Sequence, residues 1–199
     1  MSVTRFFAAL TALAIAYPLA ARAQAVQILP PEQQIAAAII PLPADLRAGA
    51  TVLGYAPDGR LTTLRAGKGE MTCLASDPKL QRFHVACYHN ALEPFMARGR
   101  ALRASGVTGA EVDSVRFREA KAGTLALPKQ PAVLYSATGA KGSFDPVTGT
   151  ASGAQRLFVV YMPYATAAST GLSPNPARDA PWIMFPGTPK AHIMFTPSM

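Results

Sequence analysis

The stretch MTCLASDPKLQRFHVACYHNALE, residues 71–93, contains the change of side-chain pattern that decides the fold. Its apolar runs at 71–75 and 83–88 are short and are separated by a polar loop, which predicts two β-strands. From Asn90 the apolar residues recur at helical spacing, and Glu93 stands three residues further on, where a glutamate completes a capping box. Strands that are followed by a helix of this kind predict an α+β fold.

Elements on both sides of this stretch extend the pattern. Upstream, the sequence Pro-Asp-Gly at 57–59 lies between two apolar runs, which is typical of a β-hairpin. Downstream, Thr108 and Glu111 indicate the start of a second helix that ends near Ala122. The other predicted strands are 51–55, 61–64, 124–127, 132–136, 157–162, 182–185 and 191–195, and the predicted loops are 139–155 and 163–181, with a helical turn at 165–171. We therefore expect a single α+β domain with a mostly antiparallel sheet, two to three helices and long Pro-rich loops.

Residues 1–23 have the pattern of a secretory signal peptide. Arg5 precedes an apolar stretch that is too short to span a bilayer, and small residues surround a cleavage site near Ala23. The Ala-rich leader suggests a bacterial exporter, and we expect the mature protein to be periplasmic or secreted. Residues 24–43 then form a Pro-flanked entry segment with a short helix, and residues 44–199 form the α+β domain.

The helix of the entry segment is expected to begin at Pro31, because proline suits the first helical position. Ile35, Ala36 and Ile39, together with Ile40, form an apolar stripe that we expect to face the core. Pro41 ends the helix.

The chain is basic, with a formal charge of +8. Removal of the signal peptide takes away Arg5 and Arg22, which lowers this charge by two, to +6. The positive charges are scattered and no nucleic-acid-binding motif is present, so we expect no nucleic acid partner. A basic exported protein can associate with an anionic envelope surface. Since the mature chain has no apolar stretch of membrane-spanning length, we expect a soluble protein with no transmembrane segment.

Cys73 and Cys87 are the only cysteines of the chain. An even number of cysteines in an exported protein favours a disulfide, with two buried thiols as the alternative. The two cysteines fall on neighbouring predicted strands, so a bridge between them would join these strands. It would stabilise the fold by roughly 3 kcal/mol in the chain-entropy treatment.

The three histidines are the first candidates for chemistry. His84 and His89 lie in one short window, and their side chains are of the type that binds zinc or copper. Residues five apart point to opposite faces of a strand, however, so a shared metal needs a turn between them. His89 and Glu93 are better placed if one helix contains both. His192 follows a Pro-Gly turn near the end of the chain, where a neutral imidazole could act as a general base.

Aromatic residues in the Pro-rich loops are the second candidates. Tyr161 and Tyr164 flank Pro163, and Trp182 follows Pro181. Such side chains can form the wall of a sugar- or peptide-binding site, although aromatic residues fill protein cores more often.

These observations favour a non-catalytic binding or accessory module of the cell envelope or the secreted fraction. Its partner would be a small molecule, a glycan or an envelope protein, and no cofactor is predicted. No complete catalytic motif is present in the sequence. The alternative is a small hydrolase or metal-dependent enzyme whose centre is formed by His84, His89, Glu93 and His192.

Overall fold

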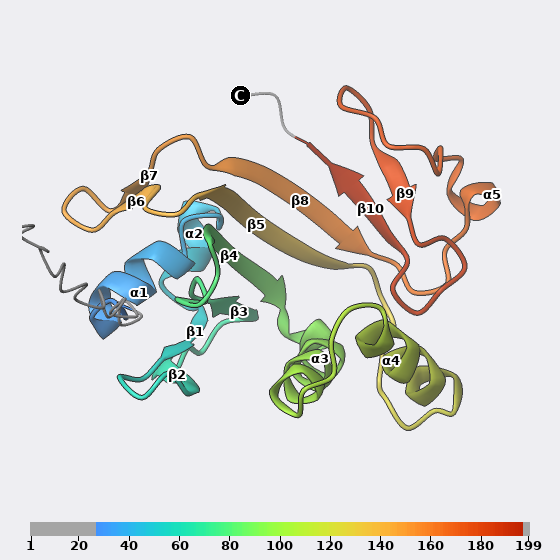
Figure 1. The fold of residues 1–199 in the computed structure, drawn as a ribbon. Coiled ribbons are helices and arrows are strands. Elements are labelled where there is room, and N and C mark those ends of the chain that lie inside the picture. Colours follow the sequence, from blue (N-terminus) through green and yellow to red (C-terminus); the bar gives the residue numbers. More distant parts are fainter. Residues whose placement is uncertain (1–26, 197–199) are drawn as a thin grey trace, which may run out of the picture.

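The computed structural model describes residues 27–196, and in this part of the chain ten strands and five α-helices form one α+β domain. The signal peptide predicted at 1–23, its cleavage site near Ala23 and the first residues of the entry segment lie outside the described residues. Figure 1 shows a long curved sheet with helices near both ends of its central strands. Within residues 27–196, no helix combines the length and the apolar character needed to cross a membrane.

Eight strands make up the main sheet, in the order β2-β1-β3-β4-β5-β8-β10-β9. All neighbours pair antiparallel except β1 and β3, which run parallel, so the predicted mostly antiparallel sheet is confirmed. The strands of this sheet are β1 (Thr51–Tyr55), β2 (Leu61–Arg65), β3 (Met71–Leu74), β4 (Arg82–His89), β5 (Ala132–Ala140), β8 (Gln155–Tyr161), β9 (Trp182–Met184) and β10 (His192–Phe195).

The parallel pairing of β1 with β3 depends on a close approach between two backbone segments. After the β1–β2 hairpin, the chain passes back against the residues that precede β1. There the Gly69 N–H donates to the Gly49 carbonyl over 2.8 Å. A Cβ atom on Gly67 would lie 2.2 Å from the Gly49 oxygen, so only glycine fits at position 67. The close crossing leaves β2 at the edge of the sheet.

Helices α1 (Pro31–Ala38) and α2 (Ala44–Arg47) cover one face of the sheet. This face receives alternate residues of β4, namely Phe83, Val85 and Cys87, which are all buried. The predicted apolar stripe of Ile35, Ala36, Ile39 and Ile40 packs against the core, but these residues are only partly buried. The most deeply buried residues of α1 are Gln34, Ala37 and Ala38.

Helices α3 (Glu93–Ala104) and α4 (Glu111–Lys121) lie near the other end of the central strands (Figure 1). Leu92 and Met96 pack on the sheet face opposite α1, where they meet Tyr88, Leu134 and Val159. Alternate side chains of β4 therefore pack on both faces of the sheet. Phe83, Val85 and Cys87 point toward α1, and Tyr88 points toward α3.

Both predicted capping boxes are wrong. His89 caps the short 3-10 helix Asn90–Leu92, because its Nδ1 accepts the Ala91 N–H over 3.1 Å. Asn90 instead bonds to Thr72 of β3. Helix α4 begins after Ala110 without a side-chain cap.

The predictions for the second half of the chain need two further corrections. No strand forms at 124–127, because Thr124 and Leu125 turn back to donate their N–H groups to the Glu119 carbonyl at the end of α4. The predicted loop 139–155 contains the end of β5 and a small hairpin of β6 (Phe144–Asp145) and β7 (Thr150–Ala151). The helical turn at 165–171 is present as α5 (Ala167–Thr170).

The disulfide predicted between Cys73 and Cys87 is confirmed. The two residues are directly opposite each other on β3 and β4, and both are fully buried. Leu42, Val52 and Met71 pack around them in the core beneath α1 and α2.

Candidate functional site

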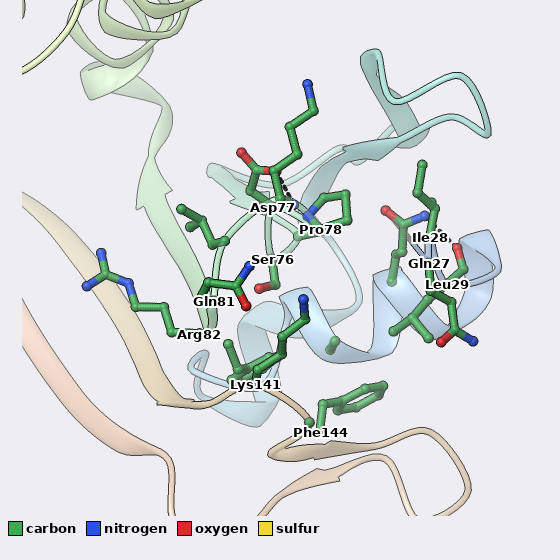
Figure 2. Close-up of a pocket in the computed structure, with 17 residues that line it drawn as sticks. Gln27, Ile28, Leu29, Ser76, Asp77, Pro78, Gln81, Arg82, Lys141 and Phe144 are labelled. Carbon is green, nitrogen blue, oxygen red and sulfur yellow. Dashed lines mark hydrogen bonds between the residues drawn. The ribbon is translucent and has the colours of Figure 1, made fainter. Parts of the chain in front are cut away.

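A pocket of about 700 Å³ lies on the side of the sheet that α1 covers, next to the start of β4 (Figure 2). Three segments surround it: α1 with the chain leading into it, the β3–β4 loop at residues 75–81 with the start of β4, and the β5–β6 turn with the start of β6. Its volume is within the range of roughly 300–1,000 Å³ that is usual for small-molecule sites.

The floor of the pocket is apolar. Phe83 of β4 and Phe144 of β6 are both buried, and their rings are stacked with centroids 6.2 Å apart. Ala37 of α1 packs against the same cluster, together with the partly buried Leu29. A ligand in this pocket would therefore lie against hydrocarbon and aromatic surface.

Gln34 fixes the wall of the pocket that is formed by α1 and the residues before it. Its side-chain amide donates to the Leu29 carbonyl over 2.7 Å and to the Tyr55 carbonyl over 2.9 Å, while its oxygen accepts the Tyr55 N–H over 2.8 Å. These bonds satisfy a buried amide and join α1 to β1, which explains why a glutamine faces the core. They also hold the backbone at Leu29 against the pocket.

The β3–β4 loop has its own internal hydrogen bonds. The Asp77 carboxylate accepts the Lys79 N–H over 2.9 Å, and the Asp77 carbonyl accepts the Leu80 N–H over 3.0 Å. Pro78 restricts the backbone between them. Burial, reinforced by the neighbouring Asp77 carboxylate, raises the pKa of Tyr55 to about 12. The turn is thus stabilised by bonds within the loop itself.

Three polar side chains are directed toward the middle of the pocket. Figure 2 shows Ser76 and Gln81 from the β3–β4 loop and Lys141 from the β5–β6 turn pointing inward, while the guanidinium of Arg82 is turned away. The Ser76 oxygen accepts the backbone N–H of His84 over 3.0 Å, so its own proton remains to be donated elsewhere. The pocket therefore combines an apolar floor with a small group of hydrogen-bond donors.

The predicted histidine candidates do not share a centre. His84 and His89 lie on β4 five residues apart, which is about 17 Å along a strand. His192 lies on β10, and β5 and β8 separate β10 from β4, a distance of about 14 Å across the sheet. Residues 27–196 contain no group of three or more histidine, cysteine, aspartate or glutamate side chains that could hold a metal ion.

Each of these candidates has a local partner instead. The His84 Nδ1 lies 2.8 Å from the Thr138 hydroxyl, and burial lowers the pKa of His84. Glu93 forms hydrogen bonds with the Tyr88 hydroxyl and with Arg100. Burial also raises the pKa of Tyr88.

His192 is buried between aromatic rings. Its ring lies 4.9 Å from that of Tyr161 and 5.8 Å from that of Phe185. Its Nδ1 donates to the Lys190 carbonyl over 2.6 Å, because a carbonyl can only accept, and the neutral ring then carries no proton on Nε2. Burial lowers the pKa of His192, which keeps the ring neutral near pH 7.

None of the aromatic candidates lines the pocket. Tyr161 is buried under His192, and burial raises its pKa to about 12. Trp182 is half-buried on β9 opposite Met194. Tyr164 is exposed in the loop after β8, where its φ of 64° is unusual for a residue other than glycine.

A second polar cluster joins α3, α4 and the residues before β10. Asp113 pairs with Arg116 and accepts a hydrogen bond from Lys190 over 2.8 Å. The Arg116 guanidinium lies 3.9 Å from the centre of the Phe95 ring and donates to the Phe95 carbonyl over 3.2 Å. Burial alone would raise the pKa of Asp113, but the bonds from Lys190 and Arg116 outweigh it and lower that pKa. These contacts indicate a structural junction between the helices and the sheet.

No protein-family model, no curated protein and no solved structure matches this chain. The geometry of the molecule is therefore the basis for the functional argument.

The sequence prediction missed the pocket and its polar residues. Ser76 and Gln81 lie in a loop that connects two recognisable strands, and Lys141 lies about 60 residues further along, in a stretch predicted as an irregular loop. What joins them is the pairing of β4 with β5, which places Arg82 opposite Ala140. Side-chain periodicity does not reveal which strands pair, so no local signal pointed to this site.

Proposed function

We propose that this chain is a non-catalytic binding module that is exported to an oxidising compartment and holds a small, largely apolar molecule in the pocket beside α1. The single observation that supports it most strongly is the apolar floor of a pocket of about 700 Å³, with a few inward-directed polar groups. Ligand sites commonly combine a mainly apolar lining with a few polar groups that orient the ligand.

The rigidity of the surrounding segments supports this proposal. The disulfide joins the two strands that carry the β3–β4 loop, and Gln34 joins the opposite wall to β1. A site whose walls are held before binding loses less entropy when the ligand enters. The same disulfide supports the proposal of export, because such bonds persist in oxidising compartments.

The alternative, a hydrolase or metal enzyme based on His84, His89, Glu93 and His192, requires these groups at one centre. The strand order holds β4 and β10 apart, and each histidine has its own partner. No feature of this arrangement favours that alternative over binding.

Binding of the neutral, apolar dye Nile red tests the proposal. We expect the wild-type protein to bind one dye molecule, with a rise in fluorescence. Gln81→Trp should abolish this binding, because Gln81 is exposed, points into the pocket, and would place an indole there. Gln130→Trp is the matched control, since Gln130 is exposed and lies outside the pocket.

Two results would contradict the proposal. One is the absence of stoichiometric binding to the wild-type protein. The other is an equal loss, or equal retention, of binding in the two tryptophan variants, which would place the dye elsewhere on the molecule. Native mass spectrometry of protein isolated under non-denaturing conditions would measure the mass of a natural ligand. Such a ligand should be present in Gln130→Trp and absent from Gln81→Trp.

A further inference from the structure

We propose that the ligand of this pocket is an apolar monocarboxylate, a molecule with a hydrocarbon body and one carboxylate, and that Lys141, Ser76 and Gln81 bind the carboxylate. This inference rests on the proposed function, since it names the chemistry of the molecule that the pocket holds.

The inward-directed groups are rich in hydrogen-bond donors. The Lys141 ammonium carries three N–H donors and no acceptor. The Ser76 oxygen already accepts the His84 N–H, so the hydroxyl has a proton to donate, and the Gln81 amide adds two N–H donors. A carboxylate accepts hydrogen bonds through both oxygens and donates none, so it complements this set.

The described lining of the pocket is positively charged, with Lys79, Arg82 and Lys141 against one carboxylate, Asp77. None of the ion pairs within residues 27–196 includes Lys141, so its charge has no carboxylate partner there. Among the described residues of the lining Asp77 is the one acidic side chain, and it accepts the Lys79 N–H. The guanidinium of Arg82 is directed away from the centre. Lys141 is the cation that Figure 2 shows facing inward, so we assign to it one anionic group of the ligand.

The apolar floor of the pocket would contact the hydrocarbon part of the ligand. The stacked rings of Phe83 and Phe144 and the side chain of Leu29 lie beside the donors, so a carboxylate near Lys141 leaves its hydrocarbon body in contact with the floor. A hydrophilic anion such as acetate would contact the donors but would leave this surface bare. The hydrocarbon body therefore supplies affinity, and the donors select the head group.

Isothermal titration with three probes of equal chain length tests this inference: decanoate and decyl phosphate, each below its micellar concentration, and decan-1-ol, below its solubility limit. We expect decanoate to bind the wild-type protein about tenfold more tightly than decan-1-ol, as a charge-assisted hydrogen bond allows. Lys141→Gln should remove most of this difference while leaving the affinity for decan-1-ol unchanged. Lys129→Gln is the matched control, because Lys129 is also exposed and lies outside the pocket.

The outcomes separate this inference from the proposed function. Equal affinities for decanoate and decan-1-ol, both abolished by Gln81→Trp, would overturn the carboxylate assignment and leave the binding pocket intact. Tighter binding of decyl phosphate than of decanoate would also overturn it. An equal effect of Lys129→Gln and Lys141→Gln would show that overall charge, and not Lys141, attracts the anion. A wild-type protein that binds neither the decyl probes nor Nile red would overturn both proposals.

Discussion

Gly99, in the middle of α3, provides the sharpest test of how the helices are joined. A Cβ atom at this position would lie 3.0 Å from Nη1 and 3.4 Å from Cζ of Arg116. In an ordinary helix interior, Gly→Ala stabilises a protein by about 1 kcal/mol. Here the new methyl group would press on a guanidinium held by the Phe95 carbonyl, the Phe95 ring and Asp113. The effect of the substitution therefore depends on whether Arg116 can move.

We expect that it cannot move without losing these bonds. Overpacking in a well-filled interior costs about 1–3 kcal/mol, which exceeds the gain in helix propensity. Gly99→Ala should therefore lower the free energy of unfolding by about 1 kcal/mol. In an Arg116→Ala background the close neighbour that remains is Nη1 of Arg103, 3.3 Å from the new Cβ at the end of a flexible side chain, and the same substitution should raise the free energy of unfolding by about 1 kcal/mol. The two effects differ by about 2 kcal/mol, which is the expected coupling energy between the two positions.

Urea unfolding of the wild type, the two single variants and the double variant, followed by circular dichroism, measures this coupling. Arg116→Met serves as a second background in which the volume of the side chain is largely kept. If Gly99→Ala stabilises the wild type and the Arg116 variants equally, the guanidinium does not press on α3 and the junction described above is wrong.

Three further predictions concern the sheet and its buried groups. Replacing Cys73 and Cys87 together by alanine should lower the free energy of unfolding by at least about 3 kcal/mol in urea, and an unchanged value would contradict a stabilising disulfide. Gly67→Ala should lower the free energy of unfolding by more than about 3 kcal/mol or prevent folding, because the new Cβ would overlap a backbone carbonyl. A variant with wild-type stability would show that the two backbone segments can move apart. Burial lowers the pKa of His84 and His192, so below pH 6.5 the unfolded state binds protons more readily than the folded state. The free energy of unfolding should therefore decrease as the pH is lowered below 6.5, by at most about 1.4 kcal/mol per pH unit for each histidine. His192→Gln should reduce this slope relative to the wild type in urea unfolding between pH 5 and 7, and an unchanged slope would mean that His192 titrates alike in both states.

Local pattern was sufficient to predict most of the elements. The apolar alternation at 51–55 and 83–88 and the Pro-Asp-Gly turn depend on neighbours in the sequence, and the strands appear there. The capping boxes failed because a nearer competitor existed. His89 reaches the Ala91 N–H from the end of β4, and Asn90 is drawn to the hydroxyl of Thr72 across the sheet. Tertiary contacts decided which side chain would cap the helix.

The order of the strands could not be read in the same way. Whether β3 lies beside β1 or beside β2 depends on the contact of Gly67 with the backbone at Gly49, which leaves no mark on side-chain periodicity. The histidine hypothesis has the same limit, because residue type named the candidates while strand order sets the distance between His192 and β4. A candidate site built from residue types alone needs the pairing of the strands before it can be judged.

The disulfide could be predicted from the sequence, and it joins two strands whose place in the sheet could not. Cys73 lies three residues before Ser76, and Cys87 lies six residues after Gln81, so the bridge closes the loop that carries two of the three inward-directed donors. Within that loop, Asp77 and Pro78 limit the backbone further. The third donor, Lys141, reaches the pocket because β5 pairs with β4 on the other side of the same bridge. A covalent link that the sequence indicates from its two cysteines thus holds the register of the strands whose connections form the pocket. Under the proposed function, the bridge fixes where the donors stand before the ligand arrives.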